Sequence, residues 1–123
     1  MNGLEYIADT NAIIYLLAGR ECMKPYLESH LGVSVISVME LLSFPGITEE
    51  EDRTIRTLLS HCEVLGINDD IREKTIQTKR TQKVKLPDAI IAATAMTHEL
   101  PLITADAGLF DVDGLQIEKL LLT

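Results

Sequence analysis

In the stretch YIADTNAIIYLL, residues 6–17, a short apolar run gives way to Asp9-Thr10-Asn11 and then to a longer apolar run. The first run predicts a buried strand over 5–8, and the second predicts a helix over about 11–17. Asp9 therefore ends a strand, and strand ends form the rim where open α/β sheets bind ligands. A carboxylate there carries a desolvation cost that a partner or a metal ion offsets. We interpret Asp9 as functional, because Thr10 and Asn11 could cap the helix in its place.

Predicted strands and helices alternate along the rest of the chain. Pro25 fits the first turn of a helix that runs to about Leu31, and Val33–Ile36 is typical of a strand. Further helices are predicted over about 37–42, 48–61, 68–81 and 87–96, with capping-box spacing at Thr48–Glu51 and a cap at Asn68. Further strands are predicted over 63–67, 102–104 and 115–117. Such alternation indicates parallel strands joined by right-handed helical crossovers. We therefore expect one domain over residues 1–123, an α/β/α sandwich of three layers around a mainly parallel sheet of four to five strands.

Three further acids stand at comparable positions. Glu40 lies in the first turn of one predicted helix, Asp88 follows the Pro at the start of another, and Asp106 follows a predicted strand. Each has a structural alternative: a capping box with Ser37 for Glu40, the helix dipole for Asp88, and a turn for Asp106. Together with Asp9 they would repel one another unless a cation neutralised them. A site of oxygen ligands suits Mg²⁺ or Mn²⁺, so the set indicates metal-dependent chemistry.

The composition is that of a globular protein with an acidic surplus. The 123 residues are 46% hydrophobic and 24% charged, with a net charge of −8. The apolar stretches fall short of the roughly 20 residues that cross a bilayer, and the first residues carry no basic region typical of a secretory signal. Cys22 and Cys62 do not form a disulfide framework. We therefore expect a cytoplasmic protein that does not bind a membrane.

The basic residues are concentrated in one part of the chain. Six of the eleven Lys and Arg residues lie between Arg72 and Lys85, directly before Asp88. A solvated helix face is one interpretation of this segment, and a surface that binds phosphates is the other. The overall negative charge disfavours a nucleic-acid partner, but this local distribution keeps such a partner open.

Four motifs, in order along the chain, resemble those of the PIN domain family. They are Asp9-Thr10-Asn11, Ser37-Val38-Met39-Glu40, Leu86-Pro87-Asp88-Ala89-Ile90-Ile91-Ala92-Ala93-Thr94-Ala95 and Leu102-Ile103-Thr104-Ala105-Asp106. The third is the most specific. In length and motif spacing the chain is most similar to the VapC-type toxins of type II toxin–antitoxin pairs. The resemblance extends over essentially the whole chain.

This resemblance implies a metal-dependent endoribonuclease that hydrolyses RNA phosphodiester bonds with Mg²⁺ or Mn²⁺. The implied catalytic residues and metal ligands are Asp9, Glu40, Asp88 and Asp106, supported by Thr10 and Asn11. The candidates for binding the RNA backbone are Lys79, Arg80, Lys83 and Lys85. Many relatives carry an acid directly before the Phe of the last motif, where this chain has Leu109. Asp111 or Asp113 is therefore an alternative to Asp106 as the last ligand.

The resemblance also implies a homodimer and a cognate antitoxin protein as partner. Leu41, Leu42 and Phe44, with the helix after Thr48, could form an apolar contact face for it, although such residues are more often part of a core. The alternative function is a non-catalytic PIN-like module that binds RNA or protein, which the four acids argue against. A phosphate-receiving signalling domain would need paired acids after the first strand and a Lys after the last strand, and neither is found. No phosphate-binding GxxxxGK[ST] loop or GxSxG motif occurs, and the three histidines lie in predicted helices away from the motifs.

Overall fold

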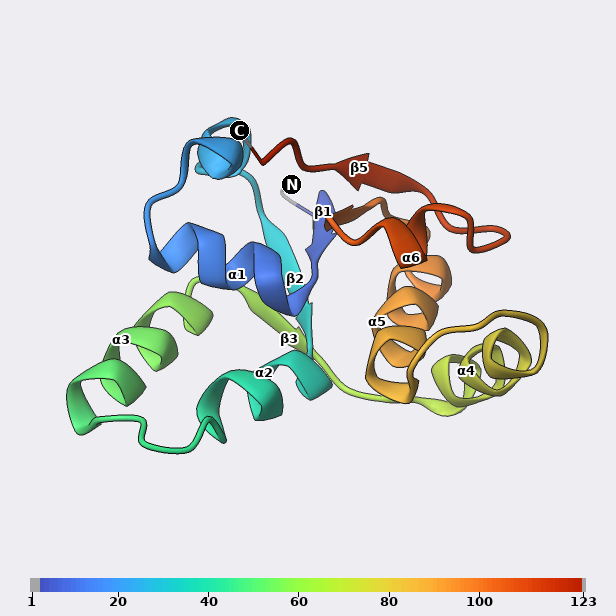
Figure 1. Ribbon diagram of the computed structural model, residues 1–123, viewed down its shortest axis with the longest axis horizontal. Coiled ribbons are helices and arrows are strands. Elements are labelled where there is room, and N and C mark those ends of the chain that lie inside the picture. Colours follow the sequence, from blue (N-terminus) through green and yellow to red (C-terminus); the bar gives the residue numbers. More distant parts are fainter. Residues whose placement is uncertain (1–2, 123) are drawn as a thin grey trace.

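The computed structural model describes residues 3–122, in which a five-stranded sheet lies between two groups of helices (Figure 1). The strands are β1 (Tyr6–Ala8), β2 (Leu31–Ser34), β3 (Glu63–Leu65), β4 (Leu102–Thr104) and β5 (Ile117–Lys119). Their order in the sheet is β3-β2-β1-β4-β5, and every pairing is parallel. The predicted α/β class is confirmed, and the sheet is parallel throughout rather than only mainly so.

The helices form a layer on each side of the sheet. The α-helices are α1 (Thr10–Leu17), α2 (Val35–Leu42), α3 (Glu49–Leu59), α4 (Asp69–Thr81), α5 (Leu86–Thr97) and α6 (Ala107–Phe110), and η1 (Glu21–Tyr26) is a 3₁₀ helix. Figure 1 shows α1, α2 and α3 on one side of the strands and α4, α5 and α6 on the other. In the part of the chain that the structure describes, no helix is both long enough and apolar enough to cross a membrane.

Alternate residues of the central strands supply the two halves of the core. Ile7 and Leu102 pack with α5 and α6 on one face, whereas Ala8 and Ile103 pack with α1, α2 and η1 on the other. This follows from the strand repeat of two residues, which sends successive side chains to opposite faces. Because both faces are covered, the central strands are mainly apolar, whereas the edge strands β3 and β5 carry charged residues.

The predicted helix from Pro25 to about Leu31 is wrong. The chain instead forms η1, which ends at Tyr26, and β2 begins at Leu31. Gly32 belongs to β2 rather than to a turn before it. A Cβ built on Gly32 would lie 2.8 Å from Cδ1 of Ile7 and 3.1 Å from Cδ1 of Leu65, so the missing side chain lets its neighbours close over the strand.

The boundary between β2 and α2 also differs from the prediction. The strand ends at Ser34, whose hydroxyl accepts the N–H of Ile36 at 3.2 Å and caps α2. Val35 and Ile36 are therefore helical despite their β-branched side chains, because packing between the layers outweighs a weak intrinsic preference. The predicted capping box of Ser37 and Glu40 is consequently wrong.

Other local predictions fare better. Thr48 and Glu51 form the predicted capping box at the start of α3, and Asn68 caps α4 through the N–H of Ile71 at 2.8 Å.

The last strand lies two residues later than predicted, at 117–119 rather than 115–117. The short helix α6 was not predicted, because its four residues are too few to show a helical repeat.

Candidate functional site

Four acids lie at the edge of the sheet where the strands end. Asp9 follows β1 directly, Asp106 lies two residues after β4, and Glu40 lies in α2, which follows β2. Asp88 lies in the first turn of α5. Because β2, β1 and β4 are neighbouring parallel strands, their carboxyl ends share one rim, as the sequence predicted.

The charges of these acids act on one another. Burial is the main cause that raises the pKa of Asp9, and the nearby charges of Asp106 and Asp88 raise it further. Burial likewise raises the pKa of Asp88 most, followed by the charges of Asp106 and Glu40. Lys85, which directly precedes α5, acts in the opposite direction and lowers the pKa of Asp88. The structure therefore places all four acids in one electrostatic neighbourhood.

Asp9 is both buried and part of the helix cap. Its side chain is almost fully buried, and Oδ1 accepts the N–H of Ala12 at 2.7 Å. The expectation that Thr10 or Asn11 would cap α1 in its place is wrong. Thr10 is instead the first residue of α1, and Asn11 is exposed on the same helix. Capping satisfies one oxygen of Asp9 but does not cancel the cost of burying its charge, as its raised pKa shows.

Thr104 is a site residue that the sequence analysis missed. It is fully buried at the end of β4, and its Oγ1 accepts the N–H of Asp106 at 3.0 Å. A hydrogen bond from the Thr104 side chain also lowers the pKa of Asp9, against the stronger effect of burial. The same hydroxyl thus connects the first acid to the last. The sequence did carry a signal for this role: a residue with a hydroxyl group ends an otherwise apolar strand, two positions before Asp106.

Glu40 is exposed on α2 and is held by α1. Thr10 Oγ1 lies 2.6 Å from Glu40 Oε1 and 2.8 Å from Oγ of Ser37, which is fully buried. The hydroxyl of Thr10 therefore contacts one of the four acids directly. The three side chains form one hydrogen-bonded group across the α1–α2 contact.

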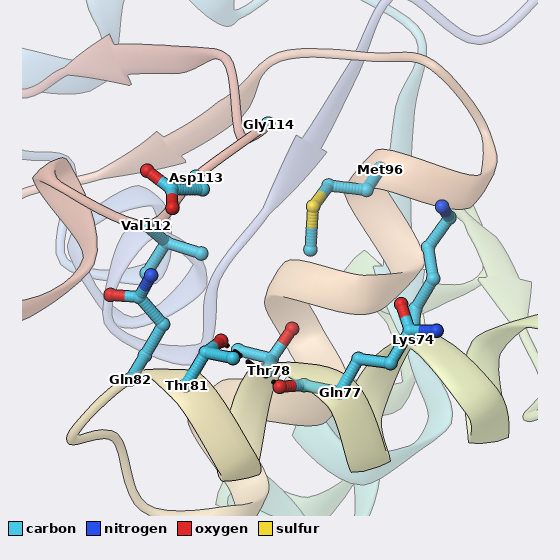
Figure 2. A pocket seen from close by; sticks show the side chains of 9 residues that line it. All are labelled: Lys74, Gln77, Thr78, Thr81, Gln82, Met96, Val112, Asp113 and Gly114. Carbon is cyan, nitrogen blue, oxygen red and sulfur yellow. Dashed lines mark hydrogen bonds between the residues drawn. The ribbon is translucent and has the colours of Figure 1, made fainter.

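Asp106 lies among the acids of the rim, whereas Asp113 does not. The charge of Asp106 acts on both Asp9 and Asp88. Its Oδ1 also accepts the N–H of Gly108 at 2.9 Å and caps α6, so the turn role considered from the sequence is real as well. Asp113 lies elsewhere, on the rim of a depression of about 450 Å³ between α4, α5 and the chain before β5 (Figure 2). None of the four acids lines that depression.

The donor set fits a hard divalent cation, although the acids are not in chelating positions. Among residues 3–122, no three His, Cys, Asp or Glu side chains are arranged to hold a metal ion as they stand. The carboxylates instead take local partners at Ala12, Thr10 and Gly108. Mg²⁺ keeps several water molecules and uses one or two carboxylates directly, so a close cluster of three is not a requirement for it. All-oxygen donors whose charges repel one another are suited to such an ion.

The four basic candidates lie between the last turn of α4 and the start of α5, the helix that carries Asp88. Lys79 and Arg80 end α4, and Lys83 and Lys85 lie in the loop to α5; all four are exposed. Lys79 Nζ donates to the carbonyl of Val84 at 2.8 Å, which braces this loop. None of the four takes part in the salt bridges found in residues 3–122. Their charges are therefore available to a ligand.

An apolar depression extends from Glu40 between α1, α2 and α3. It has a volume of about 400 Å³ and is lined by Thr10 and Glu40 at the site and by Ile14, Leu17, Leu41, Phe44 and Ile55 among its other residues. Phe44 is 70% exposed, whereas Leu41 is only 7% exposed and belongs to the core. Of the residues suggested by the sequence for a contact face, Phe44 is the one that the structure leaves open.

Comparisons with known proteins agree with the fold and the motifs. The sequence matches the family described as PIN domain over residues 6–115. A chain of the toxin–antitoxin complex from Klebsiella pneumoniae is 33% identical, with a TM-score of 0.78; the match covers 90% of this chain and 95% of that one. A search of curated proteins gave no significant match.

Two other solved structures are similar in fold. VapBC-1 from nontypeable Haemophilus influenzae is 25% identical, with a TM-score of 0.80 and coverage of 94% of this chain and 98% of that one. VapBC2 from Rickettsia felis, bound to a DNA fragment from its promoter, is 16% identical, with a TM-score of 0.81 and coverage of 96% and 100%.

We predict that Asp9→Asn stabilises the protein near neutral pH without divalent cations, by about 1–3 kcal/mol. Asn can still accept the N–H of Ala12, but it brings no charge into the buried position. The pKa of Asp9 is raised in the folded state, so folding favours the protonated form of this side chain. Its contribution to the free energy of unfolding is therefore complete below its unfolded pKa and is lost as the pH rises through its folded pKa. The advantage of Asn should therefore shrink toward about pH 4, near the pKa of an unfolded Asp.

Urea unfolding in the presence of a chelator, at about pH 7 and about pH 4, measures this difference. Asp9→Ala is the control, since it removes the charge together with the cap and should be about 1 kcal/mol less stable than Asp9→Asn. An Asn variant that is less stable than wild type near neutral pH would contradict the prediction.

Proposed function

Because this chain belongs to the PIN domain family, we propose that it is a metal-dependent ribonuclease and the toxin of a type II toxin–antitoxin pair. The observation that carries this proposal is the gathering of Asp9, Glu40, Asp88 and Asp106 at one rim, with the pKa of Asp9 and of Asp88 raised. Acids whose ionised forms are disfavoured by burial and by one another mark a functional site with a physical reason. Chains of toxin–antitoxin complexes are among its structural relatives.

In this proposal the four acids hold Mg²⁺ or Mn²⁺. A divalent cation, when bound, polarises the scissile phosphate and lowers the pKa of a water molecule. Asp9 would supply charge from a buried position and Asp88 from a half-buried one, while Glu40 is oriented by Thr10 and Asp106 is held by Thr104 and Gly108. Asn11 is exposed next to Thr10 and would contribute only from the outer rim.

Histidine does not serve as the general base in this scheme. His30, His61 and His98 lie just beyond η1, α3 and α5, rather than within the helices as predicted. Each precedes a strand, so all three lie at the opposite edge of the sheet from the acids. In this proposal the acids at the rim would therefore orient the attacking water.

We propose that the RNA backbone binds the basic segment formed by Lys79, Arg80, Lys83 and Lys85. These side chains are exposed and lie next to the start of α5, which carries Asp88. A phosphate held there would place the adjoining backbone near the acids while offsetting their negative charge. Such contacts release counterions, so binding should weaken steeply with added salt.

We propose that the cognate antitoxin occupies the apolar depression between α1, α2 and α3. Its walls are apolar, and Thr10 and Glu40 form one end of it. A segment with apolar side chains would bury Phe44 and Ile14, which are 70% and 44% exposed. Because the depression ends at Glu40, a protein docked there would also obstruct the site. The homodimer implied by the family resemblance remains a prediction.

We expect purified protein to cleave single-stranded RNA with Mn²⁺ or Mg²⁺ and to stop when the cation is chelated. Asp9→Asn and Asp88→Asn should each lower the cleavage rate by at least about 100-fold, because each removes a charge from the site. The measurement is the initial rate on a labelled RNA. Asp113→Asn is the control: it makes the same chemical change outside the site and should keep full activity.

Equal cleavage by wild type and both site variants would overturn the nuclease assignment. If wild type neither cleaves RNA nor binds Mn²⁺, the non-catalytic PIN-like module takes its place. If Asp113→Asn is as inactive as Asp88→Asn, the last ligand has been misassigned.

Replacing Lys79, Arg80 and Lys83 by Ala should raise KM for RNA about tenfold or more while changing kcat little. Three phosphate contacts should also lower the slope of log KM against log salt by about 2–3. A matched triple variant, Lys24, Arg53 and Arg56 to Ala, removes the same charge elsewhere on the surface. The proposal fails if the two triple variants behave alike, or if kcat falls and KM does not.

Phe44→Ser should weaken binding of the antitoxin at least about tenfold, because a buried aromatic anchor contributes more than 1 kcal/mol. RNA cleavage by the free protein should be unchanged. Leu27→Ser is the control, since Leu27 is 62% exposed but lies outside the depression. Calorimetry with the purified antitoxin measures both, and an equal loss for the two variants would place the docking surface elsewhere.

A further inference from the structure

In the hydrogen-bonded group of Ser37, Thr10 and Glu40, the hydroxyl of Thr10 makes two contacts but has only one proton to donate. Thr10 Oγ1 lies within hydrogen-bond distance of both Ser37 Oγ and Glu40 Oε1. A hydroxyl carries a single proton, and an ionised carboxylate can only accept. Thr10 must therefore donate to Glu40, and the proton of the Ser37–Thr10 contact must come from Ser37.

Ser37 has no other evident task in α2. It does not cap the helix, because Ser34 does. It is fully buried, and in residues 3–122 Thr10 is the only hydrogen-bond partner found for its hydroxyl. A buried hydroxyl without a partner is costly, so the proton of Ser37 is committed to Thr10 rather than shared with water.

We propose that Ser37 is a positioning residue for Glu40 and acts through Thr10. Ser37 donates a hydrogen bond to Thr10, and Thr10 donates its own proton to the carboxylate of Glu40. Glu40 is exposed and would otherwise sample several rotamers at a cost in entropy when it binds a ligand. The relay fixes one oxygen of Glu40 before any cation arrives and leaves the other free.

The biological role of this relay rests on the proposed function, but the relay itself can be tested without it. The order of the Glu40 side chain can be measured without metal, from three-bond NMR couplings that report its rotamers. The affinity for Mn²⁺ is then measured separately, from the EPR signal of free Mn²⁺. We expect Ser37→Ala to average the Glu40 rotamers and to weaken Mn²⁺ binding about fivefold, the effect of one hydrogen bond.

Two sets of variants separate the hydroxyl from packing and folding. Ser37→Thr and Ser37→Val have the same shape, so the Thr variant should keep the order of Glu40 and the Val variant should lose it. Ser34→Ala removes another fully buried hydroxyl that caps the same helix. It should lower thermal stability while leaving Glu40 ordered and Mn²⁺ affinity unchanged.

The outcomes distinguish this proposal from the proposed function. Rotamers of Glu40 that are unaffected in Ser37→Ala would overturn the relay, as would equal behaviour of the Thr and Val variants. An equal loss of Mn²⁺ affinity in Ser34→Ala would show that Ser37 acts only through helix stability and would also overturn it. If the wild-type protein binds no Mn²⁺ but its Glu40 rotamers still depend on Ser37, the metal site is refuted and the relay is supported. In a Glu40→Ala background, Ser37→Ala should cause no further loss of affinity.

Discussion

The parallel pairing of β1 with both β2 and β4 is the constraint on which the rest of the structure depends. It brings the ends of three strands to one rim, and with them acids that lie between positions 9 and 106 of the chain. The same constraint creates an electrostatic cost at this rim. Burial and like charge both disfavour the ionised forms of Asp9 and Asp88, and only a few hydrogen bonds from Ala12 and Thr104 act against them at Asp9. A divalent cation bound among these acids would offset this cost.

Hydroxyl groups organise the site around these acids. Thr104 connects Asp9 to Asp106 from below the rim, and Thr10 connects Glu40 to Ser37 across the contact of α1 with α2. Neutral hydroxyls can orient carboxylates without adding charge, so they do not compete with a cation for the acids as a Lys or Arg would. The site is thus acidic at its surface and is oriented by buried neutral groups.

The sequence predicted what depends on local chemistry and on the general geometry of parallel sheets. The caps at Thr48 and Asn68 need only neighbouring residues, and the shared rim of the acids follows from the alternation of strands and helices. The start of α2 was missed because Val35 and Ile36 favour strands in isolation, and packing reversed that preference. The partners of Ser37 and Thr104 depend on contacts between elements whose spacing no local pattern reveals. The same holds for the separation of Asp113 from the four acids, which only the folded positions reveal.

The placement of Glu40 has a consequence for competition between ligands. This residue lines the apolar depression and also belongs to the acidic rim, so α2 presents one side chain to two surfaces. Occupants of the two surfaces that both require Glu40 exclude each other, and thermodynamic linkage makes this antagonism reciprocal. A protein bound in the depression then lowers the apparent affinity for a ligand at the rim to an extent set by its own concentration and affinity, and a ligand at the rim acts on that protein in the same way. Which of the two surfaces is occupied then depends on the relative abundance and affinity of the two ligands, and needs no change of shape.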